Sequence, residues 1–228
     1  MMQKTILFDI NETVLDLSSL KPDFVTVFGS EEALPLWFAK LLHTSTVCIA
    51  TNVSSDFATL ANITLNTIAV HYSVNLTDED RTSLLNGLAN LQAYSDIKPA
   101  LVLLREHGFR TVAFSNSSAN LIKQQIENAM LTEYFDRVIS VETTDSFKPD
   151  PTVYQFASEV LNVPITALRL VATHDWDTHG ALTAGLKAAY IARTQAPYNP
   201  LYLMPDINDN TMLKIAQKII SVSTKKTP

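Results

Sequence analysis

Asp9 is the residue whose type and position most directly suggest chemistry. It follows a short apolar run, residues 5–8 (Thr-Ile-Leu-Phe), and precedes a polar turn that begins at Asn11. A short apolar run closed by turn residues is typical of a buried strand, so the carboxylate is expected at the C-terminal end of that strand. At that edge of an open α/β sheet an aspartate can act as a nucleophile and form a covalent ester or acyl phosphate. It can equally cap the next segment, and the run alone does not decide between these two roles.

Three further groups of polar residues lie at the ends of expected strands. Ser115 and Asn116 follow one strand, Lys148 precedes a helix start, and the segment 173–177 (Thr-His-Asp-Trp-Asp) follows another strand. Because parallel strands end at a common edge of the sheet, we expect these groups to converge with the first aspartate. Each group also has an ordinary interpretation as a helix cap or a surface charge. Their recurrence at four strand ends favours an active site.

The elements that must position these residues follow two patterns. Residues 34–91 carry apolar residues at helical spacing and almost no strand signal. From about residue 96 helices and strands alternate, with helices expected at 99–107, 119–129, 152–161 and 178–184, and strands at 110–115, 138–141, 168–172 and 188–192. Such alternation predicts a parallel sheet covered by helices on both faces. The predicted fold class is therefore α/β: a doubly wound (Rossmann-like) core of residues 1–14 and 94–228, with an all-helical segment, residues 15–93, inserted after the first strand.

Composition limits the class of protein. Of the 228 residues, 46% are apolar and 18% are charged, which permits a sizeable core and argues against disorder. A net charge of −6 without a basic stripe argues against a nucleic-acid partner. The single cysteine, Cys48, rules out an internal disulfide and fits a reducing compartment. We find no segment that approaches a membrane span and no signal peptide before the first strand, so we expect a cytoplasmic protein without a membrane partner, either a monomer or a homodimer.

The four groups resemble, in order and spacing, the four motifs of the haloacid dehalogenase superfamily. The matching residues are Asp9-x-Asn-x-Thr13, Ser115-Asn116, Lys148-Pro149 and Asp177. Within the superfamily the chain looks most like the type II (S)-2-haloacid dehalogenases, on the strength of residues 8–16, 140–142, 147–149 with Tyr154, and 174–177. The resemblance covers essentially the whole chain, and it implies a helical cap domain inserted after the first motif.

The resemblance also implies a role for each motif residue. Asp9 would displace halide from C2 of a 2-haloacid with inversion, and water would then attack the carbonyl carbon of the resulting ester and release a 2-hydroxy acid. Lys148 would offset the charge of the neighbouring carboxylates and keep Asp9 ionised, and Asp177 would orient the lysine and the hydrolytic water. The other residues implied at the site are Thr13 beside the nucleophile, Ser115 and Asn116 around the substrate's carboxylate, and Tyr154 lining the site and supporting the lysine.

Two departures from the superfamily pattern bear on the alternative function, a Mg²⁺-dependent phosphatase of a small phosphorylated metabolite. Such phosphatases carry a second acid two residues after the nucleophile, where this chain has Asn11, and an amide cannot donate a proton as a general acid does. They also carry a metal-binding acid where this chain has Thr173, although Asp175 lies close by. The favoured reading is therefore a hydrolase without a cofactor or metal that acts on a small-molecule carboxylate, with Asn11 in its substrate site.

Two other departures bear on dehalogenation itself. The resemblance implies an arginine on the first cap helix that receives the halide and the substrate's carboxylate, but this chain has Phe38 there, with Lys40 and His43 further along. His174 replaces an asparagine; it is expected to bind halide or water, or else to pack as an ordinary histidine that donates to a backbone carbonyl. These departures leave a third alternative, a protein that keeps the fold and binds ligands without catalysis.

Overall fold

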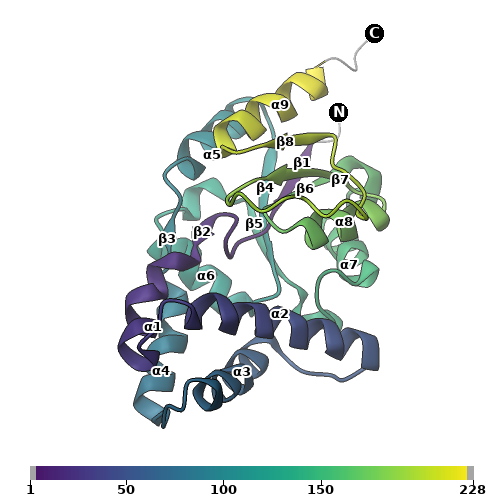
Figure 1. The fold of residues 1–228 in the computed structure, drawn as a ribbon. Coiled ribbons are helices and arrows are strands. Elements are labelled where there is room, and N and C mark those ends of the chain that lie inside the picture. Colours follow the sequence, from purple (N-terminus) through teal and green to yellow (C-terminus); the bar gives the residue numbers. More distant parts are fainter. Residues whose placement is uncertain (1–3, 225–228) are drawn as a thin grey trace.

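A six-stranded parallel sheet forms the centre of the computed structural model, which describes residues 4–224 (Figure 1). Across the sheet the strands are β5 (Arg137–Ser140), β4 (Arg110–Ser115), β1 (Thr5–Phe8), β6 (Leu168–Ala172), β7 (Lys187–Ile191) and β8 (Ile207–Asp209). This order confirms the predicted doubly wound α/β class. The chain builds one half of the sheet outward from β1 and then returns to add β6 on the other side, so the crevice where such folds bind ligands lies beside the end of β1.

The central strand β1 is buried along its whole length, which explains its uninterrupted apolar sequence. Its last residue, Phe8, lies in register with Ala113 of β4 and with Val171 of β6. All three strands therefore end at one level. The residues that follow them, including Asp9 and Thr173, are brought to the same edge.

Helices cover both faces of the sheet, as right-handed crossovers require. On one face α5 (Ile97–Glu106) packs against α9 (Met212–Thr224), with α6 (Ala119–Asn128) beside β5; on the other α7 (Pro151–Leu161) packs against α8 (Asp175–Thr183) (Figure 1). The starts of α6 and α7 are fixed by side-chain caps, because Ser118 and Asp150 accept hydrogen bonds from backbone N–H groups of the first turn.

The segment between β1 and β4 is largely helical. It contains α1 (Lys21–Phe28), α2 (Ala33–Thr51), α3 (Phe57–His71) and α4 (Asp78–Gly87), which lie together below the sheet in Figure 1. Two short strands enclose them: β2 (Leu15–Asp16) pairs antiparallel with β3 (Gln92–Ala93). The chain therefore leaves and re-enters the region of the sheet through adjacent strands.

Several predicted boundaries are wrong. Helix α1, capped by Gly29 in the left-handed conformation, lies within the segment 15–93 that was predicted to be helical, but before residues 34–91, where the helical spacing is found. Strand β8 and helix α9 had no predicted counterpart, and α8 begins at Asp175 rather than at residue 178. Its first turn contains Asp175 and Asp177, which suits acids because the N-terminus of a helix carries partial positive charge.

Helix α2 also corrects the statement that no segment approaches a membrane span. Its 19 residues have a mean hydropathy of 1.3, enough by length and composition alone to cross a membrane. Yet α2 packs against α3 and buries side chains such as Trp37 and Leu41 inside the molecule. A buried helix of a folded protein passes the same test, so the finding is weak evidence for a span.

Candidate active site

Asp9 lies directly after β1, and other residues engage both oxygens of its buried carboxylate. Oδ1 accepts a hydrogen bond from Nζ of Lys148 at 2.7 Å, and Oδ2 accepts one from Oγ1 of Thr13 at 2.7 Å. Nδ1 of His174 lies 3.2 Å from Oδ2. Thr13 is itself fixed, since its Oγ1 accepts a hydrogen bond from the backbone N–H of Thr173 at 2.9 Å. The predicted contact between Thr13 and the nucleophile region is thus present.

Lys148 joins two buried carboxylates. Its Nζ donates to Asp9 and, at 2.6 Å, to Oδ2 of Asp177, while its backbone N–H donates to Oδ1 of Asn116 at 2.9 Å. Burial opposes ionisation of all three groups, but the mutual attraction of opposite charges outweighs it at two of them: the pKa of Asp9 lies well below its usual value and the pKa of Lys148 above its own. Burial and the charge of Asp9 raise the pKa of Asp177.

Tyr154 supports this ion pair from behind. Its hydroxyl donates to Oδ1 of Asp177 at 2.6 Å, so it supports Lys148 through that carboxylate. The contact requires close packing of α7 against α8 at Gly180, a residue that sequence reasoning did not single out. A Cβ there would lie 2.5 Å from Cβ of Pro149 and 2.8 Å from the hydroxyl of Tyr154.

His174 bridges Asp9 and a second acid, Glu12, which was not among the predicted site residues. Its Nε2 lies 2.9 Å from Oε2 of Glu12, and its ring stacks on Trp176 at 5.0 Å and lies 6.3 Å from the ring of Phe38. Burial would lower the pKa of His174, but the hydrogen bonds and charges of Asp9 and Glu12 raise it to about 10. The residue is therefore an imidazolium, and the packed histidine with a backbone partner is excluded.

The predicted substrate-binding residues of the first two motifs are held by side-chain contacts. Nδ2 of Asn11 donates to Oγ of Ser117 at 3.3 Å, and Oδ1 of Asn11 accepts from Nε2 of Gln125 at 3.0 Å. Oγ of Ser115 accepts from the backbone N–H of Ser117 at 3.2 Å. With both ends of its amide engaged by neutral groups, Asn11 offers no acidic proton to a leaving group.

Most of these residues line one small cavity of ≈ 20 Å³, room for about one water molecule. Its wall is formed by Asp9, Asn11, Phe38, Leu42, Phe57, Ser115, Asn116, Lys148, His174 and Trp176. Thr13, Tyr154 and Asp177 lie outside this wall and act on Asp9 and Lys148 from behind. The structure thus brings all ten predicted site residues together, seven of them at the cavity itself.

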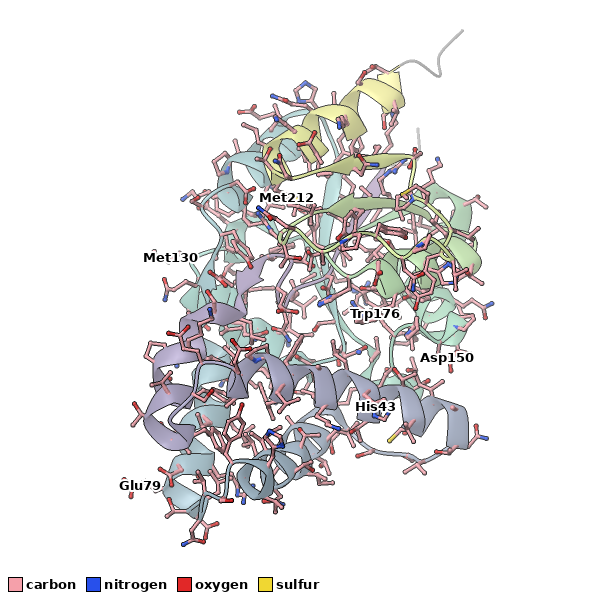
Figure 2. All side chains as sticks on the ribbon, in the orientation of Figure 1. His43, Glu79, Met130, Asp150, Trp176 and Met212 are labelled. Atoms are coloured by element: carbon pink, nitrogen blue, oxygen red, sulfur yellow. The ribbon has the colours of Figure 1, made fainter. Side chains whose placement is uncertain are left out.

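A neighbouring cavity of ≈ 300 Å³, the outer cavity, lies between α2 and the residues around Lys148 and Trp176, with His43 and Trp176 on its two sides (Figure 2). Leu42, Lys148 and Trp176 line both this cavity and the inner one. Two residues on α2, Lys40 and His43, were considered as replacements for the arginine that the resemblance implies. His43 lines only the outer cavity, and the side chain of Lys40 is exposed to solvent. Neither supplies charge at the inner cavity.

The residues beside Asp9 do not suit a divalent cation. Oδ1 of Asp175 accepts from the backbone N–H of Trp176 at 2.7 Å and Oδ2 from that of Asn199 at 3.2 Å, so this carboxylate is engaged elsewhere. Between the two buried carboxylates lies the amine of Lys148. Within residues 4–224 no group of three or more His, Cys, Asp or Glu side chains could hold a metal ion.

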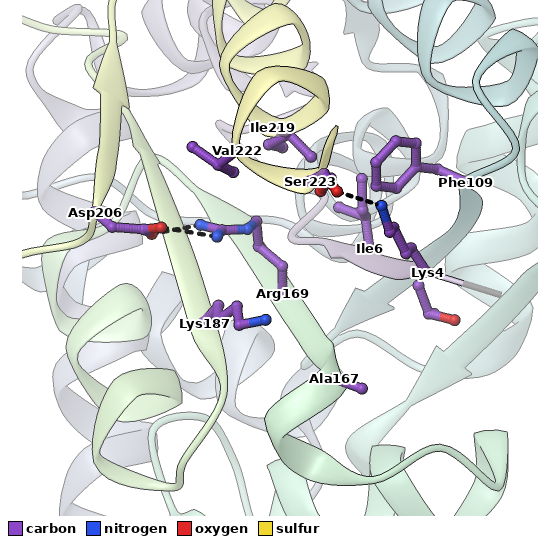
Figure 3. A pocket seen from close by; sticks show the side chains of 11 residues that line it. Lys4, Ile6, Phe109, Ala167, Arg169, Lys187, Asp206, Ile219, Val222 and Ser223 are labelled. Carbon is purple, nitrogen blue, oxygen red and sulfur yellow. Dashed lines mark hydrogen bonds and ion pairs between the residues drawn. The ribbon is translucent and has the colours of Figure 1, made fainter. Parts of the chain in front are cut away.

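A separate cavity of ≈ 300 Å³ lies at the opposite edge of the sheet, where β1 and β6 begin (Figure 3). Nη2 of Arg169 donates to Oδ2 of Asp206 at 2.9 Å, and Nζ of Lys4 donates to the backbone carbonyl of Ser223 at 2.8 Å. These contacts tie β6 and the first strand to neighbouring elements. The cavity is remote from Asp9, so we place the candidate site at the carboxyl ends of the strands.

Comparison with known proteins gives one consistent result. The model of the haloacid dehalogenase-like hydrolase family matches residues 3–168. The (S)-2-haloacid dehalogenase of Pseudomonas sp. (strain YL) is 26% identical over 205 residues, which cover 89% of this chain and 88% of that protein. The (S)-2-haloacid dehalogenase 1 of Pseudomonas sp. (strain CBS-3) is 29% identical over 196 residues, 85% of this chain and 86% of that protein.

Solved structures show the same fold. The L-2-haloacid dehalogenase from Xanthobacter autotrophicus, solved with chloropropionic acid covalently bound, superimposes with a TM-score of 0.89 at 22% identity, covering 96% of this chain and 98% of the other. The agreement extends over both the sheet and the inserted helices, since nearly the whole of each chain is aligned.

Proposed function

The chain belongs to the haloacid dehalogenase-like hydrolases, and from that premise we propose that it hydrolyses the carbon–halogen bond of a small 2-haloalkanoic acid through an ester on Asp9. One observation above all supports the proposal: the carboxylate of Asp9, 2.7 Å from the amine of Lys148, forms part of the wall of a cavity. The names of the relatives, (S)-2-haloacid dehalogenases, agree with this assignment.

The reaction needs two steps at Asp9. In the first, a carboxylate oxygen bonds to C2 of the substrate while the carbon–halogen bond breaks and the halide departs with the electron pair. In the second, water adds to the carbonyl carbon of the ester, and the ester oxygen leaves as the hydroxyl of a 2-hydroxy acid. One proton of the water ends on that hydroxyl, and the other is released as Asp9 returns to its ionised form.

Lys148 and Asp177 hold the carboxyl group of Asp9 in position during both steps. The amine holds Oδ1 of Asp9 at 2.7 Å and is held in turn by Asp177 at 2.6 Å. Because the amine is fully buried, its charge is poorly screened, so it favours an ionised Asp9 and stabilises the negative charge that develops on the ester oxygens in the second step. Thr13 and Tyr154 orient this pair.

Asn11 favours a halide as the leaving group over a phosphate ester's alcohol. A halide ion is a weak base and departs without a proton, whereas an alkoxide needs an acid beside it. The amide of Asn11 is bonded to Ser117 and Gln125 and supplies no such acid. The imidazolium of His174 provides a cation beside Phe38, where the resemblance had implied an arginine.

We further propose that residues 15–93 act as a cap domain over a core of residues 1–14 and 94–228. Helix α2 contributes Phe38 and Leu42 to the wall of the inner cavity, and α3 contributes Phe57. The pairing of β2 with β3 joins the two chain crossings at these boundaries. The substrate's halogen and alkyl group would then meet apolar rings from the cap, and its carboxylate the polar groups of the core.

Chloride release from L-2-chloropropionate and chloroacetate, measured with EDTA present, tests the proposed function. The wild type and the control Asp145→Asn, which alters an exposed aspartate in a left-handed conformation that asparagine tolerates, are expected to release chloride. Asp9→Asn is expected to release none above background. Equal chloride release by Asp9→Asn and wild type, or none from any short haloacid with the wild type, would rule out the proposal; Mg²⁺-dependent phosphate release would instead favour the phosphatase.

A further inference from the structure

Glu12 combines an unfavourable backbone conformation with an active-site contact. Its φ is +63°, in the left-handed region that favours glycine, yet the chain places a long acidic side chain there. Within the described residues, that side chain has one hydrogen-bonding partner, Nε2 of His174 at 2.9 Å, and it remains 38% exposed. A carboxylate held by one contact at the rim of a site can leave without breaking other hydrogen bonds.

The balance of charge shows why its departure would matter. Without substrate, the carboxylates of Asp9, Asp177 and Glu12 face two cations, Lys148 and His174. A 2-haloalkanoate brings a fourth negative charge into this buried cluster. Lys148 already donates to two carboxylates, so His174 is the cation with an exchangeable partner.

The cavities place the exchange at His174. Its ring and that of Trp176 line both the inner cavity and a further cavity of ≈ 220 Å³, here the Glu12 cavity, whose wall also includes Glu12 and Tyr94. The guanidinium of Arg193, which lies on the Glu12 cavity, donates to the backbone carbonyl of Thr13 and to Asp96. An entering anion would therefore meet the cation at Nε2 of His174. The partner of this nitrogen in the structure is a single, partly exposed carboxylate, that of Glu12.

We propose that Glu12 is a placeholder for the substrate: its carboxylate occupies Nε2 of His174 until the carboxylate of the incoming 2-haloalkanoate displaces it. Glu12 then swings into solvent, and the number of carboxylates around the two cations stays at three. The inference rests on the proposed function, because it adds His174 to Ser115 and Asn116 as a contact of the substrate's carboxylate. Glu12 does not touch the reacting atoms, so it would set affinity rather than the rate of carbon–halogen cleavage.

Propionate, which has the substrate's carboxylate but no halogen, is the probe for this exchange. Glu12→Gln removes the competing anion, so NMR titration is expected to show a propionate Kd about three- to fivefold lower than in the wild type, the size of a partly exposed ion pair. Glu12→Gly, which also relieves the left-handed backbone, is expected to tighten binding in the same direction. Glu159→Gln, which removes the same charge at an exposed position of α7, is expected to leave the Kd unchanged.

Two further comparisons separate displacement from a structural role. In a His174→Asn background, Glu12→Gln is expected to have no effect on propionate binding, because the shared cation is gone. Neutral propionamide is expected to bind wild type and Glu12→Gln alike. An unchanged or higher propionate Kd in Glu12→Gln, equal tightening in the His174→Asn background, or equal tightening for propionamide would each overturn the proposal.

The propionate titration does not depend on turnover, so its result tests the exchange independently of the proposed dehalogenase activity. Tighter propionate binding in Glu12→Gln together with no chloride release from any haloacid would support the exchange and reject the dehalogenase. Chloride release by the wild type, together with equal propionate binding by wild type and Glu12→Gln, would support the dehalogenase and reject the exchange. With chloropropionate as substrate, the exchange also predicts a lower KM for Glu12→Gln than for the wild type.

Discussion

Replacing Lys148 by methionine removes the cation between two buried carboxylates. At 2.7 Å and an effective dielectric constant of about 20, the attraction between Lys148 and Asp9 is of order 6 kcal/mol, and the pair with Asp177 at 2.6 Å is similar. Much of this is offset by the cost of burying the charges, so the measured loss on breaking such a pair is about 3–5 kcal/mol. We expect Lys148→Met to lower the free energy of unfolding at pH 7 by that amount.

The pH dependence of this loss provides the sharper test. In the wild type the lowered pKa of Asp9 stabilises the fold above the unfolded-state value near 3.8, and this contribution is lost as pH falls through the lower folded pKa. Without Lys148, Asp177 loses its cation, so burial raises its pKa further above the unfolded value, whereas His174 and Thr13 still contact Asp9. The variant should then lose stability as pH rises through the raised pKa of Asp177, so the difference from wild type shrinks towards acid pH.

Urea unfolding of wild type and Lys148→Met between pH 3.5 and 8 measures both effects. Lys40→Met, which removes an exposed lysine of α2, serves as the control and is expected to stay within about 0.5 kcal/mol of wild type. Chloride release by Lys148→Met is expected to fall at least ~100-fold, as when one charge-stabilising donor is removed from an active site. Wild-type stability for Lys148→Met at pH 7, or a difference independent of pH, would refute the ion-pair argument.

Two further predictions concern the groups around this pair. Tyr154→Phe leaves Oδ1 of the buried Asp177 without its hydroxyl donor, so urea unfolding is expected to show a loss of about 1–3 kcal/mol; a loss near zero would contradict the contact. His174 has a folded pKa of about 10 against 6.5 when unfolded, so its stabilisation is complete below pH 6.5 and fades as pH rises through about 10. Unfolding free energies from pH 6 to 10.5 should therefore decline in the wild type, and the decline should be weaker in His174→Gln; parallel curves would contradict an imidazolium at this position.

Much of the site could be predicted because a parallel sheet turns sequence order into spatial proximity. Asp9 follows one buried strand and Ser115 ends the next, and the two strands are paired in register, so their convergence follows from the alternation of strands and helices alone. Lys148 lies in the loop that leads from β5 to α7, and the same rule brought it to this edge. Its choice of two carboxylate partners was implied by the family resemblance.

The rest depended on geometry that no local pattern encodes. Glu12 contacts His174, which lies 162 positions away in the sequence. The contact depends on a left-handed backbone at Glu12, a conformation that is common for glycine and rare for glutamate. The strands β2 and β3 have two residues each, too few for any alternation to be visible. The start of helix α8 was predicted three residues too late, because Asp175 and Asp177 were interpreted as polar loop residues. They occupy the first turn of the helix, where acids are favourable.

The identity of the atom that attacks the substrate is tested most directly by a single turnover of L-2-chloropropionate in H₂¹⁸O with enzyme in excess, followed by mass spectrometry of the product and of the peptide that contains Asp9. If the carboxylate forms an ester that water then opens at its carbonyl carbon, the lactate carries unlabelled oxygen at C2 and the peptide gains ¹⁸O. Labelled lactate and an unlabelled peptide would mean that water attacks the carbon directly, and Asp9 would lose the role assigned to it.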